Sequence, residues 1–285
     1  MRLLSFVGRN GQSGYGAQID ETHVANLGAI MGHRYPDLRA LLGGNGLAEA
    51  KAALAIAPVL SIHEIKLLPV IPNPDKIICV GLNYETHRKE TGRPVEQHPS
   101  IFTRFAASQI AAGDPILIPR VSTALDYEGE LALIIGRPGR YIKAENAFNH
   151  VAGYACYNDG SIRDWQRHSH QFTPGKNFVG TGAFGPYMVT ADDIDDIEAQ
   201  TLTTRLNGEV MQQAKISDMI FSIGQIIEYV SSFTPLEPGD VIATGTPGGV
   251  GFKRDPQVYM KPGDICEIEI TKVGLLRNPI AQDLA

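Results

Sequence analysis

Alternating acidic residues are the first feature of this sequence that could do chemistry. Asp126, Glu128 and Glu130 directly precede the apolar run 131–135. In a strand, residues at a period of two share one face, so these three acids would lie within about 14 Å of strand. Like charges this close repel one another and are costly to bury without a cation or hydrogen bonds. The pattern indicates a metal site, and the alternative is an exposed strand edge.

A further acid, Asp159, ends the apolar stretch 151–157 and precedes a segment that predicts a helix. Groups from distant segments converge at such strand ends. The helix would project Arg163 and Gln166 from one face, and Arg163 could clamp a carboxylate with two hydrogen bonds. Oxygen donors without cysteine or histidine select Mg²⁺, Mn²⁺ or Ca²⁺ over zinc. The alternative here is an unrelated helix cap.

His87 and Glu90 are three residues apart in a segment compatible with a helix. On one helical turn the carboxylate could orient the imidazole and raise its basicity, which would give a pair able to activate water. A single histidine is more often structural or solvated, so this alternative stays open.

Two more polar features accompany these groups. The Gly-rich run 244–251 follows an apolar strand, and its backbone N–H groups could meet an anion, although it lacks the Gly-Lys-Ser/Thr ending of a phosphate loop. A tight structural turn explains this run equally well. Lys176 offers a cation in the segment 174–178, and its alternative is an ordinary solvated lysine.

The elements that must position these residues are mostly strands. Three prolines within residues 68–75 favour extended chain and place a domain boundary near residue 70. Residues 1–70 predict a small α+β module, with strands at 3–6, 15–19 and 23–27 and helices at 35–42 and 46–57. Residues 71–285 predict a strand-dominated α+β domain, barrel-like or folded as a sandwich. Its strands are expected at 76–80, 116–119, 130–135, 151–157, 202–206, 241–244 and 265–270, and its helices at 144–149, 162–168 and 217–231.

Composition narrows the class of protein. The 285 residues are 43% hydrophobic and carry a formal net charge of -6, which supports a sizeable core and gives no electrostatic reason to expect nucleic acid. The N-terminus lacks a signal-peptide core, and no apolar run approaches the roughly 20 residues that cross a bilayer. We therefore expect a cytoplasmic protein with no membrane partner. Cys79, Cys156 and Cys266 lack zinc-finger spacing and are expected to be reduced core thiols.

Taken together, several motifs resemble the fumarylacetoacetate hydrolase family. They are Gly81-Leu82-Asn83-Tyr84, Asp126-Tyr127-Glu128-Gly129-Glu130-Leu131, Asn158-Asp159 with Arg163-Asp164, Gly175-Lys176, Asn207-Gly208-Glu209 and the stretch 236–247 ending in Thr244-Gly245-Thr246-Pro247. Their order and spacing also match, over roughly residues 70–275. The resemblance is to the acylpyruvase and 2-hydroxyhepta-2,4-diene-1,7-dioate isomerase branch.

The resemblance implies a mixed β-sandwich roll, a homodimer, and Mg²⁺ or Mn²⁺ on Glu128, Glu130 and Asp159. It also implies that His87 and Glu90 activate water and that Lys176 stabilises oxyanion charge. The implied substrate contacts are Tyr84, Arg104, Arg163, Gln166 and Thr246. Arg104 stands where many members have lysine, so it would clamp a different carboxylate. Gly160 and Ile162 replace the common valine and alanine, which leaves local substrate contacts open.

The function expected from this resemblance is hydrolysis of a C–C bond in a 2,4-dioxo acid, of the acylpyruvate or fumarylpyruvate type, giving pyruvate and a carboxylic acid. The same metal-enolate chemistry supports two alternatives: decarboxylation of an oxaloacetate-like acid, and isomerisation or hydration of a 2-hydroxydienoate. A non-catalytic ligand-binding protein on the same scaffold is the alternative from another class.

Overall fold

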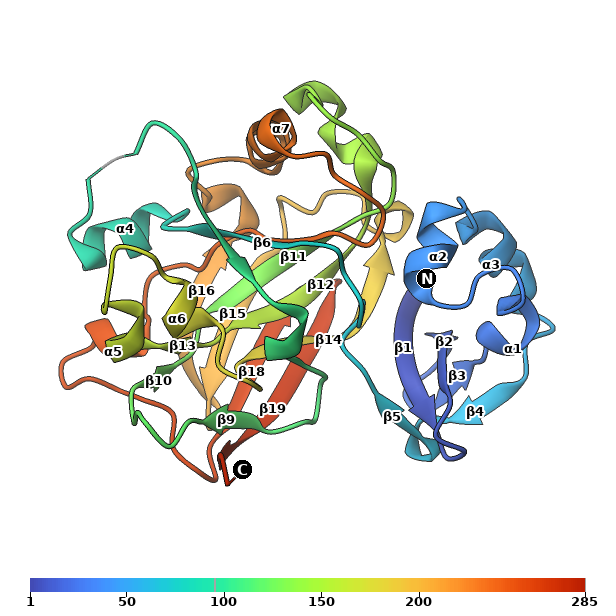
Figure 1. Cartoon of the computed structure of the whole chain (residues 1–285), viewed down its shortest axis with the longest axis horizontal. Helices are drawn as coiled ribbons and strands as arrows, with labels where there is room; N and C mark the ends of the chain where they lie inside the picture. The colour runs from blue at the N-terminus through green and yellow to red at the C-terminus, as the bar shows by residue number, and fades with distance from the viewer. Residues whose placement is uncertain (95, 285) are drawn as a thin grey trace.

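The computed structural model describes residues 1–94 and 96–284 and confirms a strand-dominated α+β architecture (Figure 1). The N-terminal lobe, residues 1–70, is drawn in blue at one side of the molecule. Its strands are β1 (Arg2–Gly8), β2 (Ser13–Gln18), β3 (His23–Ala25), β4 (Val59–Ser61) and β5 (Ile65–Leu67). Its helices are α1 (Gly28–Met31), α2 (Leu38–Gly43), α3 (Leu47–Ala53) and the 3₁₀ turn η1 (Ile62–Glu64).

The rest of the chain is built mainly from strands. They are β6 (Ile77–Gly81), β7 (Ser100–Arg104), β8 (Gln109–Ile110), β9 (Ile116–Ile118), β10 (Leu125–Asp126), β11 (Gly129–Ile135), β12 (Val151–Asp159), β13 (Ser161–Ile162), β14 (Gly182–Thr190), β15 (Thr201–Leu206), β16 (Glu209–Lys215), β17 (Val241–Ala243), β18 (Ile265–Ile270) and β19 (Gly274–Gln282). The α-helices are α4 (Glu85–Thr91), α5 (Arg163–Gln166), α6 (Thr173–Lys176) and α7 (Ile223–Phe233). Short 3₁₀ helices are η2 (Ala106–Ser108), η3 (Ala144–His150), η4 (Ala191–Asp193), η5 (Ile216–Asp218) and η6 (Gly251–Lys253).

Two sheets enclose the main apolar core. The larger runs in the order β4-β3-β2-β1-β14-β12-β11-β17-β6-β7, and the smaller runs β16-β15-β18-β19-β9. Every residue of β11 and β12 is buried, which explains why these strands are nearly continuous apolar runs. In β18 buried and half-buried residues alternate, as expected for a strand with one face on the core.

The N-terminal lobe is joined to the larger sheet by hydrogen bonds. Strand β1 pairs with β14, with Arg2 opposite Val189 and Leu3 opposite Met188. One apolar cluster contains Leu3 and Tyr15 from the lobe together with Ala155 of β12. The lobe therefore supports the strands that carry the acidic residues, through a shared sheet and a shared core.

Several predicted elements differ from those observed. The helix expected at 217–231 begins at Ile223, because the Ser222 and Gln225 side chains form a capping box there, and residues 216–218 form the separate turn η5. Residues 144–150 form a 3₁₀ helix, and the α-helix at 162–168 is limited to 163–166. The predicted strands do not include β4, β5, β7, β8, β13, β14, β16 or β19. No helix in the described part of the chain is long and apolar enough to span a membrane.

Candidate active site

Three buried carboxylates converge where β11 and β12 run side by side. Glu128, Glu130 and Asp159 each offer an oxygen, and these oxygens all lie within 4.8 Å of one another. The strand register explains the proximity, because Gly129 is opposite Asn158 and the Asp159 amide donates to the Glu128 carbonyl at 2.9 Å. Residues far apart in sequence thus form one compact oxygen cluster.

Asp126 does not join this cluster, although it alternates with Glu128 and Glu130. The strand is interrupted between β10 and β11, so the period of two does not hold across this segment. Its carboxylate instead accepts hydrogen bonds from the amides of Gly251 and Phe252, at 2.9 and 3.0 Å, and from Arg163 Nε at 2.8 Å. Gly251 is needed there, since a Cβ would lie 1.8 Å from the Val258 carbonyl oxygen. Asp126 thus fixes Arg163 and the end of the Gly-rich run.

The charges around the cluster are unevenly balanced. Lys176 Nζ lies between two of the acids, 2.5 Å from Glu128 Oε2 and 2.6 Å from Asp159 Oδ2. Burial raises the pKa of Glu128, but Arg163 and Lys176 outweigh it and lower this pKa to about 2. Burial, followed by the charges of Asp159 and Glu128, raises the pKa of Glu130 well above its usual value. Glu130 is therefore the acid whose ionisation needs a further cation.

The residues present fit a divalent metal. All three candidate ligands supply hard carboxylate oxygens, which suit Mg²⁺ or Mn²⁺. The Lys176 ammonium already seated between Glu128 and Asp159 shows that this position favours positive charge. Among the described residues, the only hydrogen-bond donor to the Glu130 carboxylate is the Gly245 amide, at 2.9 Å.

His87 and Glu90 form the expected pair on helix α4. His87 Nδ1 lies 2.6 Å from Glu90 Oε1, and Glu90 Oε2 accepts from the Gly249 amide at 2.8 Å. A carboxylate can only accept, so Nδ1 donates and the lone pair of Nε2 is left free to take a proton. The Gly-rich run therefore holds the carboxylate that orients the imidazole. It makes a second contact with α4, in which Thr86 Oγ1 accepts a hydrogen bond from the Gly248 amide at 3.0 Å.

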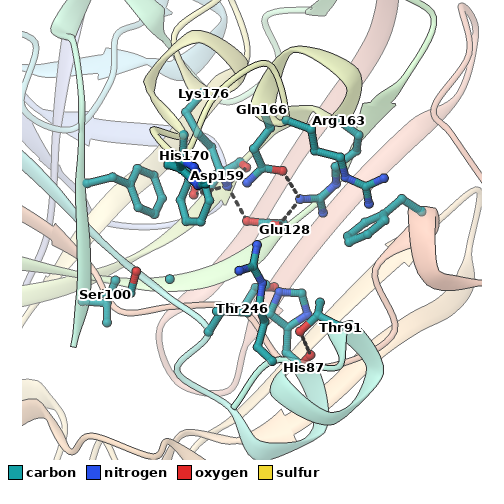
Figure 2. Close-up of a pocket in the computed structure, with 18 of the residues that line it drawn as sticks. His87, Thr91, Ser100, Glu128, Asp159, Arg163, Gln166, His170, Lys176 and Thr246 are labelled. Atoms are coloured by element: carbon teal, nitrogen blue, oxygen red, sulfur yellow. Dashed lines mark hydrogen bonds and ion pairs between the residues drawn. The ribbon is translucent and has the colours of Figure 1, made fainter. Parts of the chain in front are cut away.

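These groups open into one cavity of about 740 Å³ (Figure 2). This volume lies within the range of roughly 300–1,000 Å³ that is typical of small-molecule sites. The predicted site residues that line it are His87, Glu128, Glu130, Asp159, Arg163, Gln166, Lys176 and Thr246. Glu90 reaches the cavity only through His87.

Arg104 does not lie where a substrate contact would be, although the sequence predicts it as one. Its guanidinium is fully buried behind Asp159, with Nη1 2.6 Å from Asp159 Oδ1 and Nη2 2.7 Å from Thr181 Oγ1. It does not line the cavity. The carboxylate that Arg104 clamps is thus the protein's own Asp159, which it holds in place.

Tyr84 is also placed differently from the expected substrate contact. The side chain is fully buried outside the cavity lining, and its hydroxyl has no hydrogen-bond partner among the described residues. Burial and the nearby charge of Glu130 raise the pKa of Tyr84. The tyrosine is therefore a fully buried residue that does not line the cavity.

The two unusual residues near Asp159 have structural explanations. A Cβ on Gly160 would lie 2.3 Å from the Thr181 carbonyl oxygen, so no larger residue fits this backbone. Ile162 is fully buried and pairs with Leu125 between β13 and β10. Neither residue lines the cavity. The three cysteines are free and buried, as predicted.

Sequence reasoning missed a second group of cavity residues, most of them basic or aromatic. They are Arg93, Phe102, Arg167, His168, His170, Phe172, Phe252 and Lys253. One signal was available: Arg167 follows Arg163 by four residues, the spacing that places side chains on one helical face. Phe252 and Lys253 directly follow the Gly-rich run, but sequence alone does not show that this run folds back over α5.

A strand-rich roll that carries a buried carboxylate triad, a cavity and a His-Glu pair defines a candidate metal-dependent enzyme. The chain belongs to the fumarylacetoacetate hydrolase family, because the model of the fumarylacetoacetate (FAA) hydrolase C-terminal domain matches residues 76–281. Members of this family are enzymes, among them hydrolases, isomerases and tautomerases.

Known relatives span more than one activity. The chain is 42% identical to the mitochondrial oxaloacetate tautomerase of Xenopus laevis over 242 residues, covering 84% of this chain and 76% of that protein. It is 34% identical to a fumarylacetoacetate hydrolase from Exiguobacterium antarcticum, with a TM-score of 0.86 over 99% of this chain and 100% of that chain. A maleylpyruvate hydrolase from Sphingobium sp. SYK-6, in complex with manganese (II) ion and pyruvate, is 28% identical, with a TM-score of 0.82 and 99% of both chains covered.

Proposed function

We propose that this protein is a divalent-metal-dependent hydrolase that cleaves a C–C bond in a 2,4-dioxo acid, giving pyruvate and a carboxylic acid. The observation that carries the proposal is that His87, which is hydrogen-bonded to Glu90, lines the same cavity as the carboxylate triad. Hydrolysis needs both a group that activates water and a centre that holds the oxo acid, and these are the two groups that the cavity combines.

Glu128, Glu130 and Asp159 are the residues that would hold the cation. When bound, Mg²⁺ or Mn²⁺ would polarise the oxo group of the substrate and offset the negative charge of the departing enolate. Arg163 and Gln166 support this end of the cavity, because Arg163 Nη1 contacts Glu128 Oε1 at 2.7 Å and Gln166 Oε1 at 3.0 Å. Thr246 lines the same end, where its hydroxyl accepts from Gln212 Nε2 at 2.8 Å.

His87 carries out the proton transfer in this proposal. Nε2 removes a proton from water, the hydroxide oxygen bonds to the C4 carbonyl carbon, and the C3–C4 bond then breaks with its electron pair passing to the pyruvate enolate. The His87 imidazolium then returns its proton to C3 of this enolate, which completes pyruvate and restores the neutral imidazole. Glu90 keeps the imidazole oriented and stabilises its charged form throughout.

Lys176 is the candidate for offsetting charge on the tetrahedral intermediate, because its ammonium group is buried in the cavity wall. In the present geometry Nζ is bonded to Glu128 and Asp159. The role therefore requires Nζ to exchange one of these carboxylates for the substrate oxygen.

A second candidate, tautomerisation of oxaloacetate, is favoured by the 42% identity to an oxaloacetate tautomerase. The same His87 would move a proton between C3 and the enol oxygen, without a water nucleophile. Decarboxylation of oxaloacetate would use the same enolate. A cavity of about 740 Å³ leaves room for an acid longer than oxaloacetate, whereas the identity to the tautomerase favours the four-carbon acid.

The test is an assay of metal-stripped protein, with and without added Mg²⁺ or Mn²⁺, on acylpyruvates, fumarylpyruvate and oxaloacetate. Loss of dione absorbance with equal release of pyruvate and a second acid is the expected result. If the protein catalysed keto-enol exchange of oxaloacetate and left the diones unchanged, the function would be that of a tautomerase and not of a hydrolase. Release of carbon dioxide from oxaloacetate alone would indicate a decarboxylase.

A further inference from the structure

Three cations gather on one aromatic ring at the cavity wall. The guanidinium carbons of Arg163 and Arg167 lie 4.3 and 4.8 Å from the centroid of the Phe252 ring, and Lys253 Nζ lies 5.4 Å from it. All four residues line the cavity that contains the carboxylate triad. Cations stack favourably on an aromatic face, but three together repel one another unless an anion joins them.

Among the described residues, Arg163 has carboxylate partners, whereas the side chains of Arg167 and Lys253 have none. Arg163 binds Asp126 through Nε and Glu128 through Nη1. No hydrogen bond or ion pair of the Arg167 or Lys253 side chain occurs within the described part of the chain, and both side chains are exposed. The nearby acid Asp164 accepts hydrogen bonds from Ser122 Oγ and the Trp165 amide instead. Arg167 and Lys253 therefore keep their charge available to a ligand.

This cationic group lies next to the proposed metal end of the cavity. Arg163 links the two. Its Nη1 is 2.7 Å from Glu128 Oε1 (Figure 2), and its guanidinium lies over the Phe252 ring. The cavity thus has two ends of opposite charge: the acidic triad, and the group formed by Phe252 with Arg167 and Lys253. A ligand that satisfies both ends has an oxo-acid head and a second anionic group.

We infer that Arg167 and Lys253, seated on Phe252, bind the second carboxylate of a dianionic substrate, so that the enzyme acts on oxo diacids in preference to oxo monoacids. The inference rests on the proposed function, because it assumes that the oxo-acid head binds at the triad. It holds for either reaction considered above, since it concerns the recognition of the substrate and not the bond that changes.

The test compares two five-carbon acids that differ only at the far end: 2-oxoglutarate, which ends in a carboxylate, and 2-oxovalerate, which ends in a methyl group. Neither has a 4-oxo group that could be cleaved. Binding to the Mn²⁺-loaded full chain is measured by calorimetry. We expect 2-oxoglutarate to bind about tenfold more tightly, the effect of one charge-assisted contact, and this ratio to fall as salt is added.

The double variant Arg167→Gln/Lys253→Gln should bring the two affinities together by weakening 2-oxoglutarate and leaving 2-oxovalerate unchanged. The matched control is Arg140→Gln, which removes an arginine stacked on Tyr141 outside this cavity and should preserve the ratio. Equal affinities in the wild-type protein, or equal weakening of both acids in the double variant, would overturn the inference and leave the proposed function standing. Failure of both acids to bind the Mn²⁺-loaded protein would overturn the proposed function and, with it, this inference.

Discussion

His87 lines the same cavity as the carboxylate triad but belongs to a different element, helix α4, and its hydrogen-bond partner is Glu90. Replacing it should therefore remove proton transfer without removing a metal ligand. We expect His87→Ala to lower kcat for dione hydrolysis by about 10²–10⁴-fold, the usual contribution of a general base. Mn²⁺ affinity, measured by calorimetry, should stay within about threefold of the wild-type value, because the ligand oxygens are untouched.

Glu90→Gln is the companion variant, since the amide keeps the size of the side chain but not its charge. An intermediate loss of kcat is expected, because the imidazole remains while its orientation and charge stabilisation weaken. Comparable loss of metal affinity and turnover in His87→Ala would contradict the role assigned to this residue.

For Arg104, the residue type predicts the kind of partner but not which residue it is. The sequence predicts that a planar guanidinium at this position seeks a carboxylate, but it does not reveal that Asp159 is the nearest one. Because both partners are fully buried, Arg104→Met would leave the Asp159 charge without one of its two cationic partners. We expect a loss of about 3–5 kcal/mol in the free energy of unfolding, measured by urea denaturation. A loss under about 1 kcal/mol would show that Lys176 alone compensates Asp159.

Among the elements, the apolar strands were the most predictable. Residues 130–135 and 151–157 are buried on both faces, so their unbroken apolar runs carry a strong signal. Strand β14 was missed because Gly182, Gly185 and Pro186 interrupt its pattern, although tertiary pairing with β12 still forms it. The alternation of Asp126 with Glu128 was misleading for a related reason: the strand breaks between them, and local periodicity does not show such a break.

Helix α4 is held over the cavity by contacts with the Gly-rich run, and Thr86 makes one of them. Thr86→Val keeps the shape of the side chain but removes the acceptor for the Gly248 amide. We expect the free energy of local opening of α4 to fall by about 1 kcal/mol, the usual contribution of one hydrogen bond. Hydrogen exchange of the α4 amides should then be about fivefold faster.

The matched control is Thr91→Val on the same helix. Among the described residues, its hydroxyl donates only to the α4 carbonyls of His87 and Arg88, so its loss does not touch the Gly-rich run. Exchange rates that rise equally in both variants would indicate a general loss of helix stability and would refute the specific contact of α4 with the run.

At the scale of the whole molecule, the acidic cluster links folding stability to pH and to metal. The folded-state pKa of Glu130 is raised, so above its ordinary value of 4.5 the unfolded chain ionises while the folded chain keeps its proton. The folded state then binds more protons, and stability falls as pH rises from 4.5 toward the raised pKa. Glu128 acts in the opposite direction: its folded pKa is about 2, so its contribution is present above 4.5 and is lost as pH falls from 4.5 to about 2.

Metal-free protein should therefore be most stable near the ordinary pKa of a glutamate and weaker at about pH 8. Urea denaturation in the presence of a chelator, at a series of pH values, measures this curve. Glu130→Gln should flatten the decline above pH 4.5, whereas the exposed Glu145→Gln should leave it unchanged. Buried Asp126, whose pKa burial also raises, keeps part of the decline in place.

Added Mn²⁺ should reverse the same decline, because a cation on the three carboxylates stabilises their ionised forms in the folded state only. At a concentration of about 100 times Kd, the gain is about 2.7 kcal/mol, which corresponds to roughly 5 °C or more in Tm for a chain of this size. Glu130→Gln should lose most of this rise, since one ligand oxygen and its charge are gone, while Glu145→Gln should keep it. A rise of equal size in Glu130→Gln would show that the cation binds elsewhere. The acidic cluster would then have to be stabilised by Lys176, Arg163 and Arg104.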